Sequence, residues 1–229
     1  IAEMLASGLA VCLPDVRGTG ETSPAGSRQY RSEATSLSSS ELMLGQTLLG
    51  ARLRDLRSIL NYLRARADLD AGHIALWGDS FASANPSPFS DPLLEEGEPV
   101  PHSEPLGGLL ALFGALFEDT VGAVAAGGTL PGYEALLRDR FCYVPHDTVV
   151  PGALTAGDLC DVAAALAPRP LRLARLVDGR NVLMASAEVR ALLAPALQAY
   201  QTNPEKFVLL PPSENNLASW LASAFSAER

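Results

Sequence analysis

One serine stands in the segment Gly78-Asp-Ser80-Phe-Ala82, which fits the pattern G-x-S-x-G/A. Small residues on both sides of the serine allow the chain to turn sharply from a strand into a helix, and the turn pushes the hydroxyl outward. The apolar run at residues 74–77 predicts the preceding strand. We therefore expect Ser80 to act as a nucleophile in acyl transfer, with the Phe81 backbone N–H directed at the oxyanion that forms.

A serine hydroxyl is a poor nucleophile near neutral pH unless a positioned base takes its proton. The chain has three histidines. His73 opens the strand leading to Ser80, at the end opposite the site, so we expect it to be structural. His102 lies in a proline-rich segment that could fold over Ser80 or face solvent. His146 follows the apolar run at residues 121–126, at the strand ends where such folds place their sites, so it is a candidate substitute base or else an ordinary surface histidine.

Three aspartates have simpler roles. Asp158 and Asp161 fall in the first turn of a predicted helix, where acidic side chains favour the positive end of the helix dipole. Asp79 adjoins Ser80, but its side chain should point away from the nucleophile, so we expect a structural role for it.

Strands and helices alternate along the chain. Short apolar runs predict buried strands, and leucine-rich stretches with helical spacing predict helices that pack on them. This alternation predicts an α/β fold with a mostly parallel sheet and helices on both faces. The expected strands are residues 8–14, 74–77, 121–126, 171–177 and 206–210, and the expected helices are residues 41–67, 107–117, 158–166, 188–200 and 216–225.

Length and composition favour one domain over residues 1–229. Prolines and acidic residues are concentrated at about residues 83–105, which indicates an insertion without regular structure. The formal net charge of -9 argues against a nucleic-acid partner. No apolar run reaches the roughly 18 residues of a membrane span. The dispersed histidines and the absence of CxxC spacing exclude a recognisable metal site, and we expect no cofactor.

Three motifs in the same order support a family resemblance. Residues 15–22, Asp-Val-Arg-Gly-Thr-Gly-Glu-Thr, resemble the D-x-R-G-x-G-x-S segment of α/β-hydrolases, and residues 167–170, Ala-Pro-Arg-Pro, resemble the stretch before their acid-bearing strand. Together with the Ser80 turn they make the chain similar to acetyl xylan esterases and dienelactone-hydrolase-like proteins. The resemblance implies an α/β-hydrolase fold, a small-molecule ester substrate and an acyl-enzyme on Ser80. It also makes Asp178, which directly follows the strand at 171–177, the triad acid.

The sequence departs from this family in two places. The family carries its histidine in the loop after the last strand, and residues 211–216 contain none. The family also draws a second oxyanion donor from a loop after an earlier central strand, and the sequence begins after the place expected for it. We therefore expect a hydrolase fold that lacks its N-terminal strands. Two hypotheses stay open, a serine ester hydrolase with an unusual base and a degenerate hydrolase fold that binds or scaffolds without turnover.

Overall fold

The structure is a computed structural model that describes all residues except 24–32, 89–101, 139–141, 211–216 and 227–229. Its strands form a parallel sheet in the order β1-β2-β3-β4. They are β1 (Ile74–Gly78), β2 (Val121–Gly127), β3 (Leu171–Ala174) and β4 (Phe207–Leu210). The predicted α/β class with a parallel sheet is confirmed.

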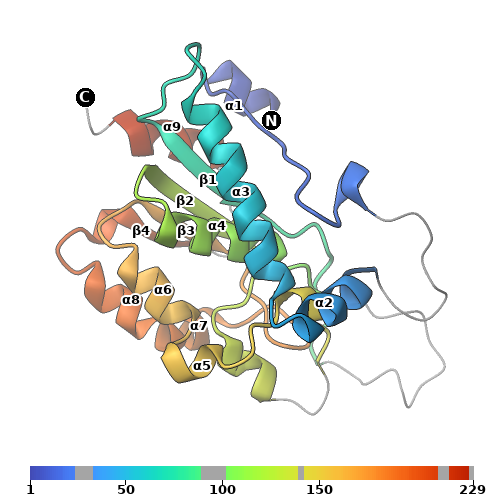
Figure 1. Cartoon of the computed structure of the whole chain (residues 1–229). Helices are drawn as coiled ribbons and strands as arrows, with labels where there is room; N and C mark the ends of the chain where they lie inside the picture. The colour runs from blue at the N-terminus through green and yellow to red at the C-terminus, as the bar shows by residue number, and fades with distance from the viewer. Residues whose placement is uncertain (24–32, 89–101, 139–141, 211–216, 227–229) are drawn as a thin grey trace.

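Helices cover both faces of the sheet (Figure 1). Alternate residues of β2 show the division, because Val124 and Ala126 belong to one core and Ala125 to another. The first core is covered by α3 (Leu48–Arg64), α4 (Leu106–Phe117), α6 (Leu159–Ala165), α7 (Ser186–Leu192) and α8 (Ala194–Ala199), and the second by α1 (Ala2–Ala6) and α9 (Leu217–Ser226). The remaining elements are α2 (Glu33–Met43), α5 (Ala153–Ala156) and the 3-10 turns η1 (Gly20–Thr22), η3 (Tyr133–Leu137), η4 (His146–Thr148) and η5 (Pro204–Lys206).

Side chains at the helix ends explain several boundaries. The Asp158 carboxylate accepts the Leu159 N–H, and Asp161 accepts the Asp158 N–H in return, which confirms the prediction that both are helix-start charges. The predicted helix at 41–67 is instead two helices, because Thr47 caps α3 by accepting the Gly50 N–H. The composition of residues 30–40, rich in serine, threonine and charge, predicts a loop, and this prediction is wrong in part because α2 begins at residue 33.

The predicted strand at residues 8–14 is not a strand. This segment has no ladder partner among the described residues, Leu13 is 70% exposed and Cys12 is exposed. Only Leu9 and Val11 pack partly against the core beneath α1 and α9. An apolar run bounded by glycine and proline indicates a buried strand only where a neighbouring strand is available to pair with it. Residues 8–14 do not pair with the open edge of β1, which bonds to β2 alone among the described strands, so this segment is irregular.

Helix α4 touches the end of β1 through backbone alone. A Cβ on Gly78 would lie 1.8 Å from the carbonyl oxygen of Gly107, so neither strand nor helix could keep its place with a side chain there. The predicted insertion at 83–105 therefore leaves the sheet after β1 and returns to it at the start of α4. Residues 89–101 of that insertion lie outside the described residues.

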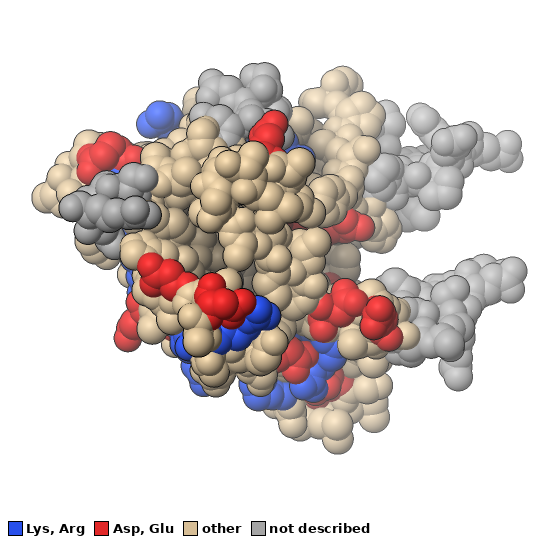
Figure 2. All heavy atoms as spheres, turned by 90° about the horizontal axis from the view of Figure 1, so that it is seen from above, with Lys and Arg blue, Asp and Glu red and all other residues tan. Residues whose placement is uncertain are grey.

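Several arginines on the surface pair with carboxylates. Arg17 bonds to Asp55 with a 2.8 Å contact, and Arg66 bonds to Asp68. On the face shown in Figure 2, blue and red side chains mostly lie against each other, with no broad basic area. None of the helices in the described ranges has both the length and the apolar character needed to cross a membrane.

Candidate active site

Ser80 lies just beyond the end of β1 and is 4% exposed. Its backbone N–H donates to the Gly127 carbonyl of β2 at 3.1 Å and to the Asp79 carboxylate at 2.9 Å. Its hydroxyl oxygen accepts the Ala82 N–H at 3.2 Å. Neighbouring strand ends thus fix the serine at the carboxyl edge of the sheet, where parallel α/β folds place their sites.

The turn at Ser80 differs from the predicted one. The strand ends at Gly78 as expected, but no helical turn follows before residue 89. Ser80 is also not among the described non-glycine residues with positive φ, so the strained conformation typical of a nucleophile turn is absent. The physical reason is that the chain runs on beside the loop after β3, forming a parallel bridge between Asn85 and Val182.

A pocket of about 270 Å³ opens at Ser80. Gly128, with φ +60°, forms part of its wall, and a Cβ there would lie 2.6 Å from the Ser80 Cβ. Within the described part of the chain, no hydrogen bond occupies the Phe81 backbone N–H, and the Phe81 ring is 88% exposed. The lining residues are Ser80, Phe81, Ala82, Ser83, Ala84, Gly128, Arg175, Val177, Asn181 and Leu183.

Sequence reasoning missed Arg175. It has φ +53°, and its Nη2 donates to the Asp79 carboxylate and, at 3.5 Å, to the Ser80 carbonyl. Asp79 is therefore engaged by Arg175 and by the Ser80 N–H, in agreement with the structural role expected for it. No residue-type pattern signals such an arginine, because its place depends on a left-handed backbone just after β3.

Asp178 emerges at the same edge of the sheet as Ser80, since β1 and β3 are parallel members of one sheet. One carboxylate oxygen accepts the N–H groups of Arg180 and Val182, each at 2.9 Å. The other oxygen accepts from the Arg180 guanidinium at 3.2 and 3.3 Å. The carboxylate thus closes the loop of residues 178–182, which we call the acid loop, and does not line the Ser80 pocket.

Asn181 is the acid-loop residue that reaches the pocket. It is 2% exposed, has φ +61°, and its side chain donates to the Ser83 carbonyl at 2.8 Å. In return the Asn85 N–H donates to the Asn181 carbonyl at 2.8 Å, and the Asn85 side chain donates to the Arg180 carbonyl at 2.7 Å. These reciprocal bonds join the Ser80 loop to the acid loop. Asn181 was missed because asparagine after a strand commonly reads as a turn residue.

The histidines lie in three different surroundings. His73 contacts Asp70 at 2.6 Å and packs edge-on against Phe225 at the start of β1, which agrees with the expected structural role. His146 is exposed in η4, beside α2, α3 and α4, and no contact within the described ranges joins its ring to Ser80 or Asp178.

His102 lies nearer to the acid loop. Its ring packs edge-on against Tyr143, with ring centres 5.7 Å apart. The adjacent Ser103 N–H donates to the Tyr143 carbonyl at 2.9 Å, and the Tyr143 N–H donates to the Gly179 carbonyl at 2.8 Å. Residues 211–216, where the resembled family carries its histidine, lie outside the described residues. Across the described ranges, no group of three or more His, Cys, Asp or Glu side chains could hold a metal ion.

Comparisons with known proteins bear on the fold. The class that the sheet and its helices define is a parallel α/β fold. A solved structure of a putative acetyl xylan esterase from Bacteroides fragilis NCTC 9343 is similar, with a TM-score of 0.57 and 17% sequence identity. The match covers 87% of this chain and 46% of that one, so this chain spans less than half of that structure's length. No family model and no curated protein matches.

Proposed function

We propose that the chain carries the site of a serine hydrolase for small carboxylic esters, such as acetyl esters. One observation carries this proposal: Ser80 lies at the carboxyl edge of a parallel sheet, in a pocket that also offers the Phe81 N–H, which bonds to none of the described residues. Ser80 Oγ would attack the acyl carbon, and the Phe81 N–H would donate to the oxyanion of the tetrahedral intermediate. The alcohol would leave with a proton, and water would then cleave the acyl-enzyme.

The proton on Ser80 needs an acceptor. Asp178 would orient a histidine, and to do so its carboxylate must give up part of its bonding to Arg180. His146 is our first candidate base from the sequence. His102 becomes a competitor, because hydrogen bonds through Tyr143 connect its segment to the acid loop. Either histidine would have to approach Ser80 in the substrate complex, so we expect slow turnover, since triad members act as a unit.

A second candidate function is ligand binding without turnover. The observation that favours it is the Asp178 carboxylate, whose two oxygens are both occupied within the acid loop. Under this hypothesis the Ser80 pocket would bind a small acyl ligand and release it unchanged.

Hydrolysis of p-nitrophenyl acetate, followed with labelling by a fluorophosphonate, separates the two functions. For the hydrolase we expect weak activity, attachment of the label at Ser80, and a fall of at least about 100-fold in Ser80→Ala. Robust activity in Ser80→Ala would overturn the assignment of the nucleophile. A chain that neither turns over the ester nor takes the label would favour binding without turnover.

The base is assigned with matched histidine variants. His146→Ala and His102→Ala are compared with His73→Ala, which changes a histidine at the opposite end of β1. Loss of activity in one of the first two, with His73→Ala unchanged, identifies the base. Activity that survives loss of both His102 and His146 would reject both assignments.

A further inference from the structure

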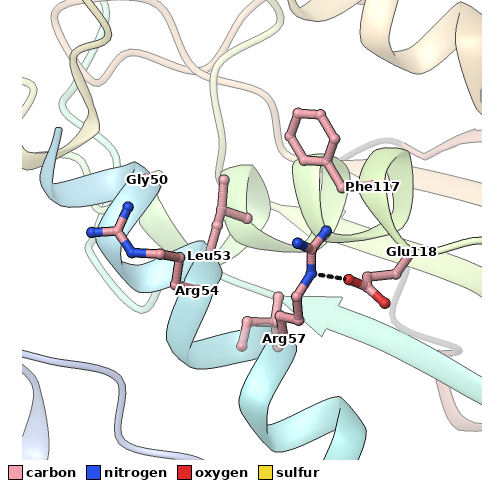
Figure 3. A pocket seen from close by; sticks show the side chains of 8 residues that line it. Gly50, Leu53, Arg54, Arg57, Phe117 and Glu118 are labelled. Carbon is pink, nitrogen blue, oxygen red and sulfur yellow. Dashed lines mark hydrogen bonds and ion pairs between the residues drawn. The ribbon is translucent and has the colours of Figure 1, made fainter. Parts of the chain in front are cut away.

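A second pocket lies between α3 and α4 (Figure 3). Its volume of about 310 Å³ falls within the range of small-molecule sites. It shares no lining residue with the Ser80 pocket, so it is a separate feature of the molecule. The lining residues are Gly50, Leu53, Arg54, Leu56, Arg57, Gly114, Phe117 and Glu118.

The floor of this α3–α4 pocket is apolar. Leu53 and Leu56 form it from α3, and Phe117 stands at the end of α4. A Cβ on Gly114 would lie 2.7 Å from Leu56 Cδ2, so this glycine allows the leucine to pack closely against α4. Phe117 is 59% exposed, so its ring would lose contact with water if an alkyl chain packed beside it.

The rim of the pocket is cationic. Arg57 Nε bonds to Glu118 Oε1 at 2.5 Å, and Arg64 Nη2 bonds to Glu118 Oε2 at 2.9 Å, so one carboxylate serves two guanidinium groups (Figure 3 shows the first pair). Arg54 bonds to the neutral Gln46 side chain at 2.8 Å. These contacts leave surplus positive charge at the pocket mouth, on a chain whose net charge is -9.

Arg57 retains guanidinium N–H donors for a ligand. Its Nε is used by Glu118, while Nη1 and Nη2 have no partner within the described ranges. The hydrogen bond from Arg57 also lowers the pKa of Glu118, so this carboxylate stays charged and holds the guanidinium beside the pocket. The outer edge of such a group presents two parallel N–H donors, which match the two oxygens of a carboxylate.

We propose that the α3–α4 pocket binds an alkyl carboxylate, with its chain on the apolar floor and its head group at Arg57. A single negative charge fits better than a phosphate, because Glu118 at the same rim would repel a second charge. The ligand needs an alkyl tail because the floor of the pocket consists of leucine and phenylalanine side chains, which an alkyl chain would cover.

Isothermal titration with decanoate below its micelle concentration tests this site directly. We expect saturable binding at a single site, and about tenfold weaker binding of octanoate, because two fewer methylenes are buried. Decanamide, which keeps the tail without the charge, should bind about five- to tenfold more weakly than decanoate. No saturable binding of decanoate up to about 1 mM would overturn the proposal.

Variants assign the binding to named groups. Arg57→Gln should weaken decanoate about five- to tenfold while leaving decanamide unchanged. The matched control is Arg66→Gln, an exposed arginine just beyond the end of α3 that bonds to Asp68 and lies outside the pocket. Phe117→Ala should weaken both ligands. Equal affinities for decanoate in Arg57→Gln and Arg66→Gln would reject the head-group assignment, and both variants should fold because the two side chains are exposed.

Discussion

The interior strands and the β1 edge contribute different halves of the candidate site. Every residue of β3 is buried, whereas β1 is only partly covered and its Trp77 is 37% exposed. The acid loop follows the interior strand and closes on itself through Asp178. Ser80 follows the edge strand and is held in place by groups that the interior supplies, among them the Gly127 carbonyl and Asn181. An edge strand can therefore carry a buried serine when its neighbours position the loop.

The largest expected effect compares the buried interior with residues 8–14, which we call the edge segment. Leu171→Ala, at a fully buried position of β3, should lower the free energy of unfolding by about 2–5 kcal/mol through lost burial and a cavity. Leu13→Ala, in the exposed segment before η1, should change it by less than about 0.5 kcal/mol. Urea unfolding of both variants measures the difference. A cost for Leu13→Ala close to that of Leu171→Ala would show that residues 8–14 are buried after all.

A smaller effect tests the connection between the Ser80 loop and the acid loop. Asn181→Ala removes the bond to the Ser83 carbonyl and forces alanine into φ +61°, so we expect a loss of about 2–3 kcal/mol. Asn181→Gly removes the same bond, but glycine adopts the left-handed backbone without strain, so this variant should lose about 1 kcal/mol less stability. Chemical denaturation of the two variants gives this difference. Equal losses of stability in the two variants would show that alanine is not strained in the left-handed backbone at position 181.

Thiol reactivity reports the same contrast without a substitution. Cys12 is exposed in the edge segment, whereas Cys160 is partly buried in α6 and burial raises the pKa of its thiol. At about pH 7.5, iodoacetamide should modify Cys12 about tenfold faster, because the thiolate is the reactive form. Peptide mass spectrometry over time measures both rates. Faster modification of Cys160 would contradict the exposed placement of Cys12.

The smallest effect concerns the corner where α3 and α4 cover the sheet. Hydrogen bonding to Arg57 lowers the pKa of Glu118 in the folded chain. Its stabilising contribution is therefore present above the unfolded pKa, near 4.3, and is lost as pH falls through the lower folded value. Because Arg57 is 57% exposed, we expect at most about 1 kcal/mol. The native chain and Glu118→Gln should differ in their urea unfolding midpoints, and this difference should narrow as pH drops from about 6 to about 3.

The strands β1 to β4 of the sheet could be predicted from the sequence, and the conformation of the segments around its β1 edge could not. The strand β2 is apolar throughout, β3 is apolar except for Arg172, and helix starts such as Asp158 carry their own capping groups, so local residues suffice. The run at 8–14 has the same apolar character but pairs with no strand in the described part of the chain, which local sequence cannot reveal. Arg175 and Asn181 were missed because their roles depend on left-handed backbone set by neighbouring loops.

The backbone contact between Gly78 and Gly107 holds the end of β1 against the start of α4, whatever chain connects the two. Because the fold itself brings these two points together, any chain that joins them forms a closed loop whose ends are already fixed. The entropy lost in closing a flexible loop rises only with the logarithm of its length, by about 0.6 kcal/mol for each doubling. The part of the segment between Asn85, which bonds to the acid loop, and Ser103, which bonds to Tyr143, can thus change in length at little cost to β1 and α4. Ser80 and its neighbours up to Asn85 belong to the candidate site and have to be kept.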